Sequence, residues 1–318
     1  MKCQEIDYMV PDYLTPAWQA GLIAEVSDPL TLNGGEPSSA SSSDPITALW
    51  RDKICQWCYN LVDHYELARE SVAVAMNIVD RFVSSRFTTI TSQTYTLVTV
   101  VAIHIAIKLV SPWKLRMDHL LDLCMGKYTA ADIASMELTV LDALSWKVHP
   151  PTAAEFCSQL IDSSFTESTP HVLNDLHDKA RYLTELAVCD YFFVTHKASS
   201  VALASIMCAL ELTDNHIDPR DKDRFTSNVA QIALDVSDEE VIQCYKTLRV
   251  MYRKNVLVDD EEAHDGEVGG SSGHESPVCV EELSAADTPP KKRKRVQQDK
   301  EGRLVSVHGE EIALFGPM

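Results

Sequence analysis

The sequence predicts an all-α protein with two consecutive five-helix folds, a flexible arm before them and a disordered tail after them. Three observations support this prediction. Apolar residues recur at helical spacing from residue 46 to about residue 253, Pro150 and Pro151 divide this region into halves, and the third helix of each half is the most apolar. No strand-like alternation competes with the helical pattern. Identity between the halves is too weak to count as a sequence repeat.

Composition limits the class of protein. The chain has 318 residues, of which 45% are hydrophobic, enough to bury the cores of two domains. Its net charge of −19 argues against broad attraction to nucleic acid or to an anionic membrane. Nine scattered cysteines and a start without a signal-like apolar core indicate a reducing compartment. The longest apolar run, residues 97–110, is shorter than the ~18 residues that cross a bilayer, so we expect a soluble protein.

The first fold is predicted at residues 46–149. Residues 1–45, rich in proline, glycine and serine, have no sustained period and are expected to form the arm. Residues 69–83 carry an apolar stripe at helical spacing, which predicts a helix that packs on a neighbour. That neighbour is predicted at residues 95–110, a helix apolar on every side that must be enclosed. A capping box of Thr129 and Asp132 begins a further helix that ends near Trp146.

The second fold is predicted at residues 150–255. Its helices are expected at residues 153–161, 172–189, 199–210, 225–234 and, from a Ser237 cap with Glu240 at its third helical position, to about Arg253. Residues 256–318 are expected to form a disordered tail, because acidic residues with interspersed glycine, serine and proline dominate residues 258–287.

Two predicted helices in the first fold carry a specific pattern. Residues 50–85 read WRDKICQWCYNLVDHYELARESVAVAMNIVDRFVSS, with Arg51, Ile54 and Trp57 spaced as in M-R-x-x-L-x-x-W and Asn77, Asp80, Arg81, Phe82 and Ser84 spaced as in N-Y-L-D-R-F-L-S. This segment resembles the cyclin box of cell-cycle cyclins, with some D-type wording. The resemblance continues through KARYLTELAVCDYFFVTHKASSVALASIMCALE in the second fold and covers about residues 46–253. It implies two cyclin folds in a protein that binds and activates a cyclin-dependent kinase and so controls cell-cycle progression.

The resemblance also implies kinase-binding residues. In cyclins a lysine at the end of the buried third helix and a glutamate on the fifth helix hold backbone groups of the kinase, and Lys108 and Glu137 match these positions. The last turn of such a helix reaches the domain surface, where an ammonium group is favoured by the helix dipole and can donate to carbonyls of a partner. The alternative is a lysine that only extends from a helix end into solvent.

Arg51 and Asp80 match an internal ion pair of the family, with a structural role. If both are buried, removing either leaves an uncompensated charge and costs about 3–5 kcal/mol. The alternative is an exposed pair worth under about 1 kcal/mol.

The resemblance implies a third site, an apolar patch that docks kinase substrates with an R-x-L motif. The matching residues are Trp50, Ile54 and Trp57. The acidic positions of the patch hold Gln56 and Asn60, and the usual glutamine on the third helix is Thr96, so the arginine of such a motif lacks its charged partner. Core packing of Trp57 is the alternative.

No residues indicate catalysis, a cofactor or a metal site. Cys55 and Cys58 form a lone C-x-x-C without a second pair, and such cysteines on an apolar helix are expected to be small core residues. His104 is expected to be a core histidine with its hydrogen bonds satisfied. The phosphoryl transfer then belongs to the kinase partner, and this chain is a non-catalytic subunit.

Two other classes remain open. A transcription regulator on the same double fold predicts basic folds and a zinc ribbon, whereas this chain is acidic and has no zinc-ligand quartet. A helical scaffold without a kinase is the other class. Leu109 and Val110, where the family has an aromatic residue and an acid, leave this class open, while Lys108 and Glu137 argue against it.

The tail, whose acidic stretch resembles the PEST tails of short-lived cyclins, contains a run of five basic residues: Lys291, Lys292, Arg293, Lys294 and Arg295. Such a run fits the acidic grooves of a nuclear import receptor, so we expect a nuclear protein that can shuttle to the cytoplasm. A solvated run, or pairing with the acidic stretch, is the alternative.

Thr288 and Ser276 precede prolines and are candidate phosphosites. A phosphate on Thr288 would add about −1.5 to −2 charge beside the run and weaken receptor binding.

Overall fold

The computed structural model describes most of the chain as helix. The described residues are 5–14, 48–86, 90–111, 115–213, 217–232, 238–262, 296–298 and 304–306. Contacts group the chain into two compact units, whose main boundary falls between Val148 and His149. Within the described residues, a single pair of three-residue strands interrupts the helical architecture, so the predicted all-α class with two consecutive folds is confirmed.

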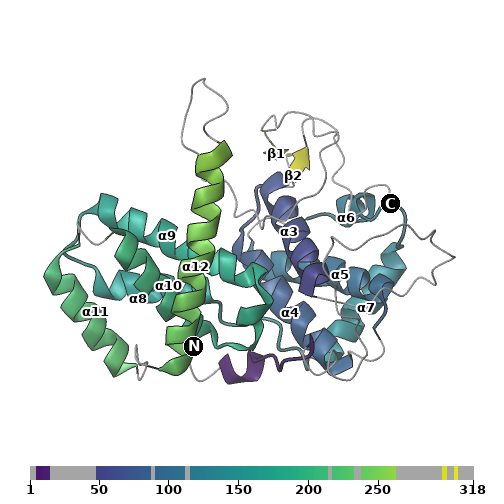
Figure 1. Cartoon of the computed structure of the whole chain (residues 1–318). Helices are drawn as coiled ribbons and strands as arrows, with labels where there is room; N and C mark the ends of the chain where they lie inside the picture. Colours follow the sequence, from purple (N-terminus) through teal and green to yellow (C-terminus); the bar gives the residue numbers. More distant parts are fainter. Residues whose placement is uncertain are drawn as a thin grey trace, which may run out of the picture. The chain divides into compact units, whose positions relative to one another are not determined.

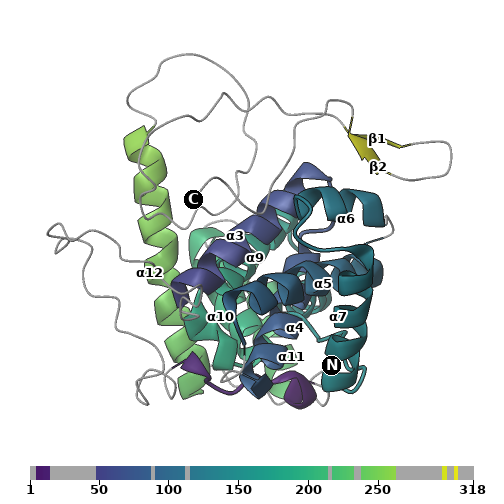
Figure 2. The same cartoon turned by 90° about the vertical axis from the view of Figure 1, so that its right-hand side faces the viewer.

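The first unit is built around one enclosed helix. Its helices are α3 (Ala48–His64), α4 (Glu70–Arg86), α5 (Ser92–Val110), α6 (Met117–Leu123) and α7 (Ala130–Ala143). Helix α5 contacts α3, α4 and α7 and lies among them (Figures 1 and 2). Its residues from Tyr95 to Ile107 are buried except for Leu97. The sequence therefore predicted the central helix and, within the described residues, the number of helices correctly, and it gave no position for α6.

Helix α5 is longer than its apolar run suggested. It begins at Ser92 because the Thr91 hydroxyl accepts the Thr94 N–H at 3.2 Å and caps the first turn. With 19 residues and a mean hydropathy of 1.5 it has the length and composition of a membrane span, the single such helix in the described ranges. Because 67% of this span is buried by neighbouring helices, its apolar composition is accounted for by the core.

Helix α7 starts and ends at defined signals. The predicted capping box is present, since Thr129 accepts the Asp132 N–H at 3.2 Å and Asp132 accepts the Thr129 N–H at 2.8 Å. The helix ends at Ala143, before the predicted end, because Ser145 and Trp146 take positive φ angles of 52° and 62°. Because the capping box sets where α7 begins, it also sets which of its residues face α5.

The second unit repeats the plan of one apolar helix among others. It contains α8 (Ala153–Ser164), α9 (Pro170–Cys189), the 3-10 helix η4 (Tyr191–Thr195), α10 (Ala198–Thr213), α11 (Pro219–Gln231) and α12 (Glu239–Glu262). Helix α10 contacts α8, α9 and α12 (Figure 1), and most of its residues are buried. The third helix of this half is thus the enclosed one, as predicted from its composition.

The last two helices differ from the predicted bounds. Helix α11 starts at Pro219, where the Asp218 carboxylate accepts the Arg220 N–H at 2.8 Å, well before the predicted residue 225. The prediction followed apolar spacing and missed the polar first turns. The predicted cap Ser237 lies outside the described residues, and Glu240 accepts the Lys197 N–H at 2.7 Å. Helix α12 extends to Glu262, past the predicted end at about Arg253.

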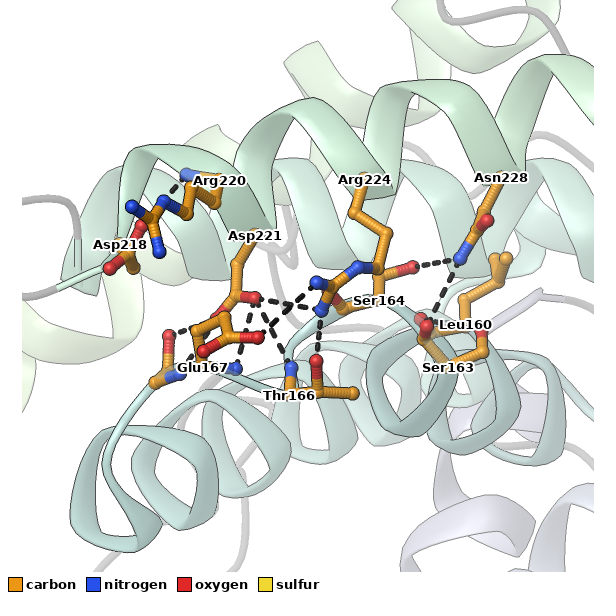
Figure 3. Close-up of polar contacts among 11 residues, drawn as sticks. Leu160, Ser163, Ser164, Thr166, Glu167, Asp218, Arg220, Asp221, Arg224 and Asn228 are labelled. Carbon is orange, nitrogen blue, oxygen red and sulfur yellow. Dashed lines mark hydrogen bonds and ion pairs between the residues drawn. The ribbon is translucent and has the colours of Figure 1, made fainter.

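A buried carboxylate holds the connection between α8 and α9. Asp221 on α11 is fully buried and accepts the backbone N–H groups of Thr166, Glu167 and Ser168 at 3.2, 3.1 and 2.8 Å (Figure 3). Arg224 lies one turn further along α11, 3.2 Å from the same carboxylate. Burial raises the pKa of Asp221, but the hydrogen bonds from Ser168 and from the backbone outweigh it, so the pKa lies below its usual value.

Part of the predicted flexible arm has defined structure. Residues 5–14 include the 3-10 helix η1 (Ile6–Tyr8). The buried Glu5 carboxylate, in the second unit, accepts the Ser199 N–H at 3.1 Å and its hydroxyl at 2.8 Å. Because so short a segment shows no helical period, the sequence could not predict that it is ordered. Residues 15–47 lie outside the described part of the chain.

The predicted tail also contains a regular element. Strands β1 (Val296–Gln298) and β2 (Leu304–Ser306) pair antiparallel, with Gln297 opposite Val305. Three residues per strand are too few for alternation to be detected in the sequence. The other residues after 262 lie outside the described part of the chain.

Candidate partner-binding site

The structure brings the two predicted kinase-binding residues together. Lys108 stands in the last turn of α5 and Glu137 stands in the middle of α7. The Lys108 ammonium donates a hydrogen bond to Glu137 Oε1. The two side chains are 35% and 23% exposed, so the pair lies at the surface of the first unit. A pair with this exposure joins side chains of α5 and α7 and can still be reached from outside.

The local structure explains this placement. The core-facing part of α5 ends at Ile107, and Ser111 closes the helix by donating its N–H to the Ile107 carbonyl at 3.0 Å. Lys108 is therefore the first residue of α5 to leave the core. At the carboxyl end of a helix its positive charge is favoured by the helix dipole. On α7, Glu137 follows the partly buried Met136 and precedes the exposed Leu138, at the edge of the face that meets α5.

His104 lies one turn before Lys108 and completes the cluster. It is 8% exposed, and its Nδ1 lies 3.9 Å from Glu137 Oε2. Burial lowers the pKa of His104 most, Lys108 lowers it further, and Glu137 opposes both, so the pKa lies below its usual value. The histidine is a core residue, as expected. Its Nδ1, however, has no hydrogen-bond partner among the described residues, so the expectation of satisfied hydrogen bonds was wrong.

Two exposed leucines flank the ion pair. Leu109, next to Lys108, is 43% exposed, and Leu138, next to Glu137, is 57% exposed. Large apolar side chains beside a surface ion pair are typical of the parts of a protein surface that bind another protein. Leu109 stands where the cyclins have an aromatic residue, while no motif in the sequence points to Leu138.

The predicted internal ion pair is deeply buried. Arg51 on α3 donates to Asp80 on α4 through Nη2 to Oδ2 at 2.9 Å and through Nε to Oδ1 at 3.0 Å. Burial lowers the pKa of Arg51, and the attraction of Asp80 outweighs it, so the pKa lies above its usual value. Tyr13 donates its hydroxyl to Asp80 Oδ1 at 2.8 Å and is the member that the sequence analysis missed. An isolated tyrosine before a serine-rich stretch gives no signal from which this contact could be predicted.

The predicted docking patch is only partly at the surface. Ile54 is 6% exposed and belongs to the core, whereas Trp50 and Trp57 are partly exposed. The amide of Gln56 donates to Asn60 at 3.3 Å, so these polar side chains pair with each other. The patch therefore presents two tryptophans and no carboxylate at the positions where the family has them.

Other predicted features fall in different places. Cys55 and Cys58 are fully buried thiols in the core, so the expectation of small core residues is confirmed. No cluster of three or more metal-ligating side chains occurs among the residues that the structure describes. The basic run and the candidate phosphosites lie outside the described residues: Lys291, Lys292, Arg293, Lys294, Arg295, Ser276 and Thr288.

Comparison with known proteins agrees with this architecture. The family model for the cyclin N-terminal domain matches residues 35–149, and that for the cyclin C-terminal domain matches residues 151–264. The fold consists of two successive helical domains, each with one enclosed helix. The two matches assign these domains to the cyclin N-terminal and C-terminal domains. The chain belongs to the cyclin family.

Similar sequences come from several branches of this family. The chain is 26% identical to the soybean (Glycine max) G2/mitotic-specific cyclin S13-6 over 238 residues, which cover 71% of this chain and 49% of that protein. It is 26% identical over 285 residues to cyclin-D3-3 of Arabidopsis thaliana, covering 83% and 75%. It is 27% identical over 181 residues to human (Homo sapiens) cyclin-O, covering 56% and 50%. The chain thus spans about half the length of the soybean and human relatives.

A solved structure shares the fold. The crystal structure of a viral cyclin from herpesvirus saimiri superposes with a TM-score of 0.54 at 15% identity, covering 65% of this chain and 86% of that chain. At this level of identity the likeness shows the fold alone.

Proposed function

We propose that this chain is the regulatory subunit of a cyclin-dependent protein kinase, which it binds and activates to control cell-cycle progression. Membership of the cyclin family supports a regulatory and non-catalytic role. The observation that carries the proposal is the surface ion pair of Lys108 and Glu137, placed where two exposed leucines flank it.

The ion pair offers both kinds of hydrogen bond that a partner backbone needs. Lys108 uses one donor on Glu137 and has further N–H groups for carbonyls, while Glu137 Oε2 is not taken by Lys108. The ends of a partner helix expose N–H and C=O groups without internal partners, and such groups match this donor and acceptor set. Leu109 and Leu138 would add apolar contacts around the polar centre.

The chemistry takes place in the kinase. Binding at this surface repositions the kinase's mobile helix and activation loop, and so completes a phosphoryl-transfer site made by kinase residues. The contribution of this chain is binding energy that favours the active kinase conformation.

The test measures binding of the purified chain to each of a panel of purified cyclin-dependent kinases, together with histone phosphorylation. We expect one or more kinases to bind and be activated by the wild type, and a Lys108→Ala/Glu137→Ala variant to lose both effects. The control removes a different exposed ion pair, that of Asp178 and Arg181 on α9, and should leave binding unchanged.

Other outcomes would favour the other classes. If no kinase in the panel binds the wild type, the proposal fails and a helical scaffold or a transcription regulator on the same fold becomes the better interpretation. Equal loss in both variants would indicate a general effect of charge and not a contact made by Lys108 and Glu137.

We also propose that the docking patch of Trp50 and Trp57 recruits kinase substrates, with weaker binding than in cyclins that have carboxylates there. Trp50 and Trp57 supply partly exposed rings, which would hold the leucine of an R-x-L peptide. Because no carboxylate stands at the usual positions, we expect weak binding. Affinity for an R-x-L peptide that is unchanged in Trp50→Ala would remove this role.

Nuclear import through residues 291–295 is proposed from the sequence. Replacing the five basic residues with alanine should abolish nuclear accumulation of a tagged chain. Thr288→Glu should reduce it and Thr288→Ala should not, because only the first places negative charge beside the basic run. Unchanged accumulation in Thr288→Glu would exclude the phosphorylation switch.

A further inference from the structure

A buried nitrogen beside the Lys108–Glu137 pair lacks a hydrogen-bond partner among the described residues. This atom is Nδ1 of His104, on a residue that is 8% exposed. It lies 3.9 Å from Glu137 Oε2, which is too far for a hydrogen bond. The backbone of Leu115 acts on the ring in the direction that raises its pKa. Because Nδ1 has no acceptor within hydrogen-bond distance among the described residues, we assign the proton of the neutral ring to Nε2.

The two protonation states of this ring act differently on Glu137. In the neutral state Nδ1 presents a lone pair to the carboxylate and cannot donate to it. In the protonated state Nδ1 carries a proton and can donate a charge-assisted hydrogen bond to Oε2 after a small side-chain movement. The charged groups that act on the ring among the described residues are Lys108 on α5 and Glu137 on α7. Together with burial they keep the ring neutral at about pH 7.

We propose that His104 is a positioning residue for the partner contact: its neutral ring leaves Glu137 Oε2 free to accept a partner's backbone N–H, and its protonated ring takes that oxygen. This role rests on the proposed function of the Lys108–Glu137 pair. With the ring protonated, Glu137 accepts from Lys108 on Oε1 and from His104 on Oε2, so each oxygen already has one donor within the chain and offers fewer acceptor sites to a partner. A second positive charge then also lies beside Lys108. Affinity for the kinase falls as the ring gains its proton.

Two substitutions separate these states. Leucine has a size near that of the ring and no polar atoms, so His104→Leu leaves Oε2 free at every pH. Glutamine carries an amide N–H that can donate to Oε2 at every pH, so His104→Gln imitates the protonated ring without titrating. Both variants keep Lys108 and Glu137. A purely structural role for His104 would predict equal binding by the two variants at all pH values.

The first measurement uses the full chain without a kinase. NMR titration of the His104 ring, assigned by the signal missing from His104→Gln, gives its pKa. We expect Glu137→Gln to lower this pKa, because the favourable anion is lost, and Lys108→Met to raise it, because the nearby cation is lost. A His104 pKa that neither substitution moves would overturn the proposal.

The second measurement uses a purified kinase identified by the panel. As the pH falls through the His104 pKa measured by NMR, we expect wild-type affinity to fall, by up to about tenfold for each pH unit below that pKa, while that of His104→Leu does not share this loss. At the starting pH of about 7.5 we expect His104→Gln to bind more weakly than His104→Leu. The leucine variant controls for titration of the kinase. An equal pH dependence in the wild type and His104→Leu overturns this role alone. Absence of kinase binding by the wild type at about pH 7.5 overturns the proposed function and this role with it.

Discussion

Two ion pairs in the first unit share one design and differ in burial. Arg51–Asp80 joins α3 to α4, Lys108–Glu137 joins α5 to α7, and in each pair the residues are 29 positions apart. The side chains are 3% and 4% exposed in the first pair and 35% and 23% exposed in the second. Buried charges have given up water and depend on each other, whereas water can replace the partner of an exposed charge. By this argument the first pair contributes more to stability than the second, and the second agrees with the proposed contact to a partner.

Breaking the buried pair gives the largest expected effect. Arg51→Ala leaves the Asp80 carboxylate uncompensated in the core and should lower the free energy of unfolding by about 3–5 kcal/mol, measured by urea denaturation. The double variant Arg51→Met/Asp80→Leu should lose much less, because no charge remains buried. A loss below about 1 kcal/mol for Arg51→Ala would place this pair in the same class as the exposed one.

The second unit offers a buried carboxylate that accepts hydrogen bonds mainly from backbone N–H groups and also lies beside Arg224. Asp221→Asn weakens hydrogen bonds from three backbone N–H groups and should cost about 2 kcal/mol at pH 7. Because its pKa is lowered in the folded state, the stabilisation is present above the unfolded pKa and is lost as pH falls through the folded pKa. The difference between wild type and variant should therefore shrink below about pH 4.

The matched control for this pH dependence is Asp223→Asn, on the exposed side of the same helix. This variant tests whether removal of any carboxylate from α11 produces the pH dependence expected of Asp221→Asn. A constant difference between Asp221→Asn and wild type from pH 7 to pH 3 would mean that Asp221 titrates like an exposed carboxylate.

Tyr13 extends the buried pair to a third residue, and its removal should have an intermediate effect. Tyr13→Phe deletes the hydroxyl that donates to Asp80 at 2.8 Å and leaves one carboxylate oxygen with fewer donors, at a cost of about 1.5 kcal/mol. Tyr128→Phe, which deletes an exposed hydroxyl bond to the Gln93 carbonyl, is the control and should cost less. Equal costs in urea denaturation would show that burial does not strengthen the Tyr13 contact.

Each feature that was predicted correctly has a signal within a short stretch of sequence. The capping box of Thr129 and Asp132 is contained within four residues, and the enclosed helix α5 is visible in its own composition. Tyr13 and Asp221 were missed because each acts on residues far away in the sequence: Asp80 is 67 positions from Tyr13, and Ser168 is 53 from Asp221. Composition and periodicity contain no information about such contacts.

The candidate site was only partly predicted, because the local motif identifies residues but does not show their long-range contacts. The motif around Lys108 and Glu137 pointed to both residues, but it did not reveal that they bind each other. His104 was expected to be a satisfied core residue, because its burial follows from the pattern of α5. Its distance from Glu137 follows from the packing of α5 on α7, which the sequence does not determine.

The smallest expected effect on stability belongs to the exposed pair. Lys108→Ala, Glu137→Ala and the double variant form a thermodynamic cycle, and we expect a coupling energy below about 1 kcal/mol in urea denaturation, because water replaces either partner. The same cycle for Arg51 and Asp80 should give a coupling of several kcal/mol. A coupling above about 2 kcal/mol for Lys108 and Glu137 would mean that the pair holds α5 on α7, and lost kinase binding would then reflect a disturbed fold. A small coupling energy between Lys108 and Glu137, together with full loss of kinase binding in the double variant, would show that these residues contact the kinase.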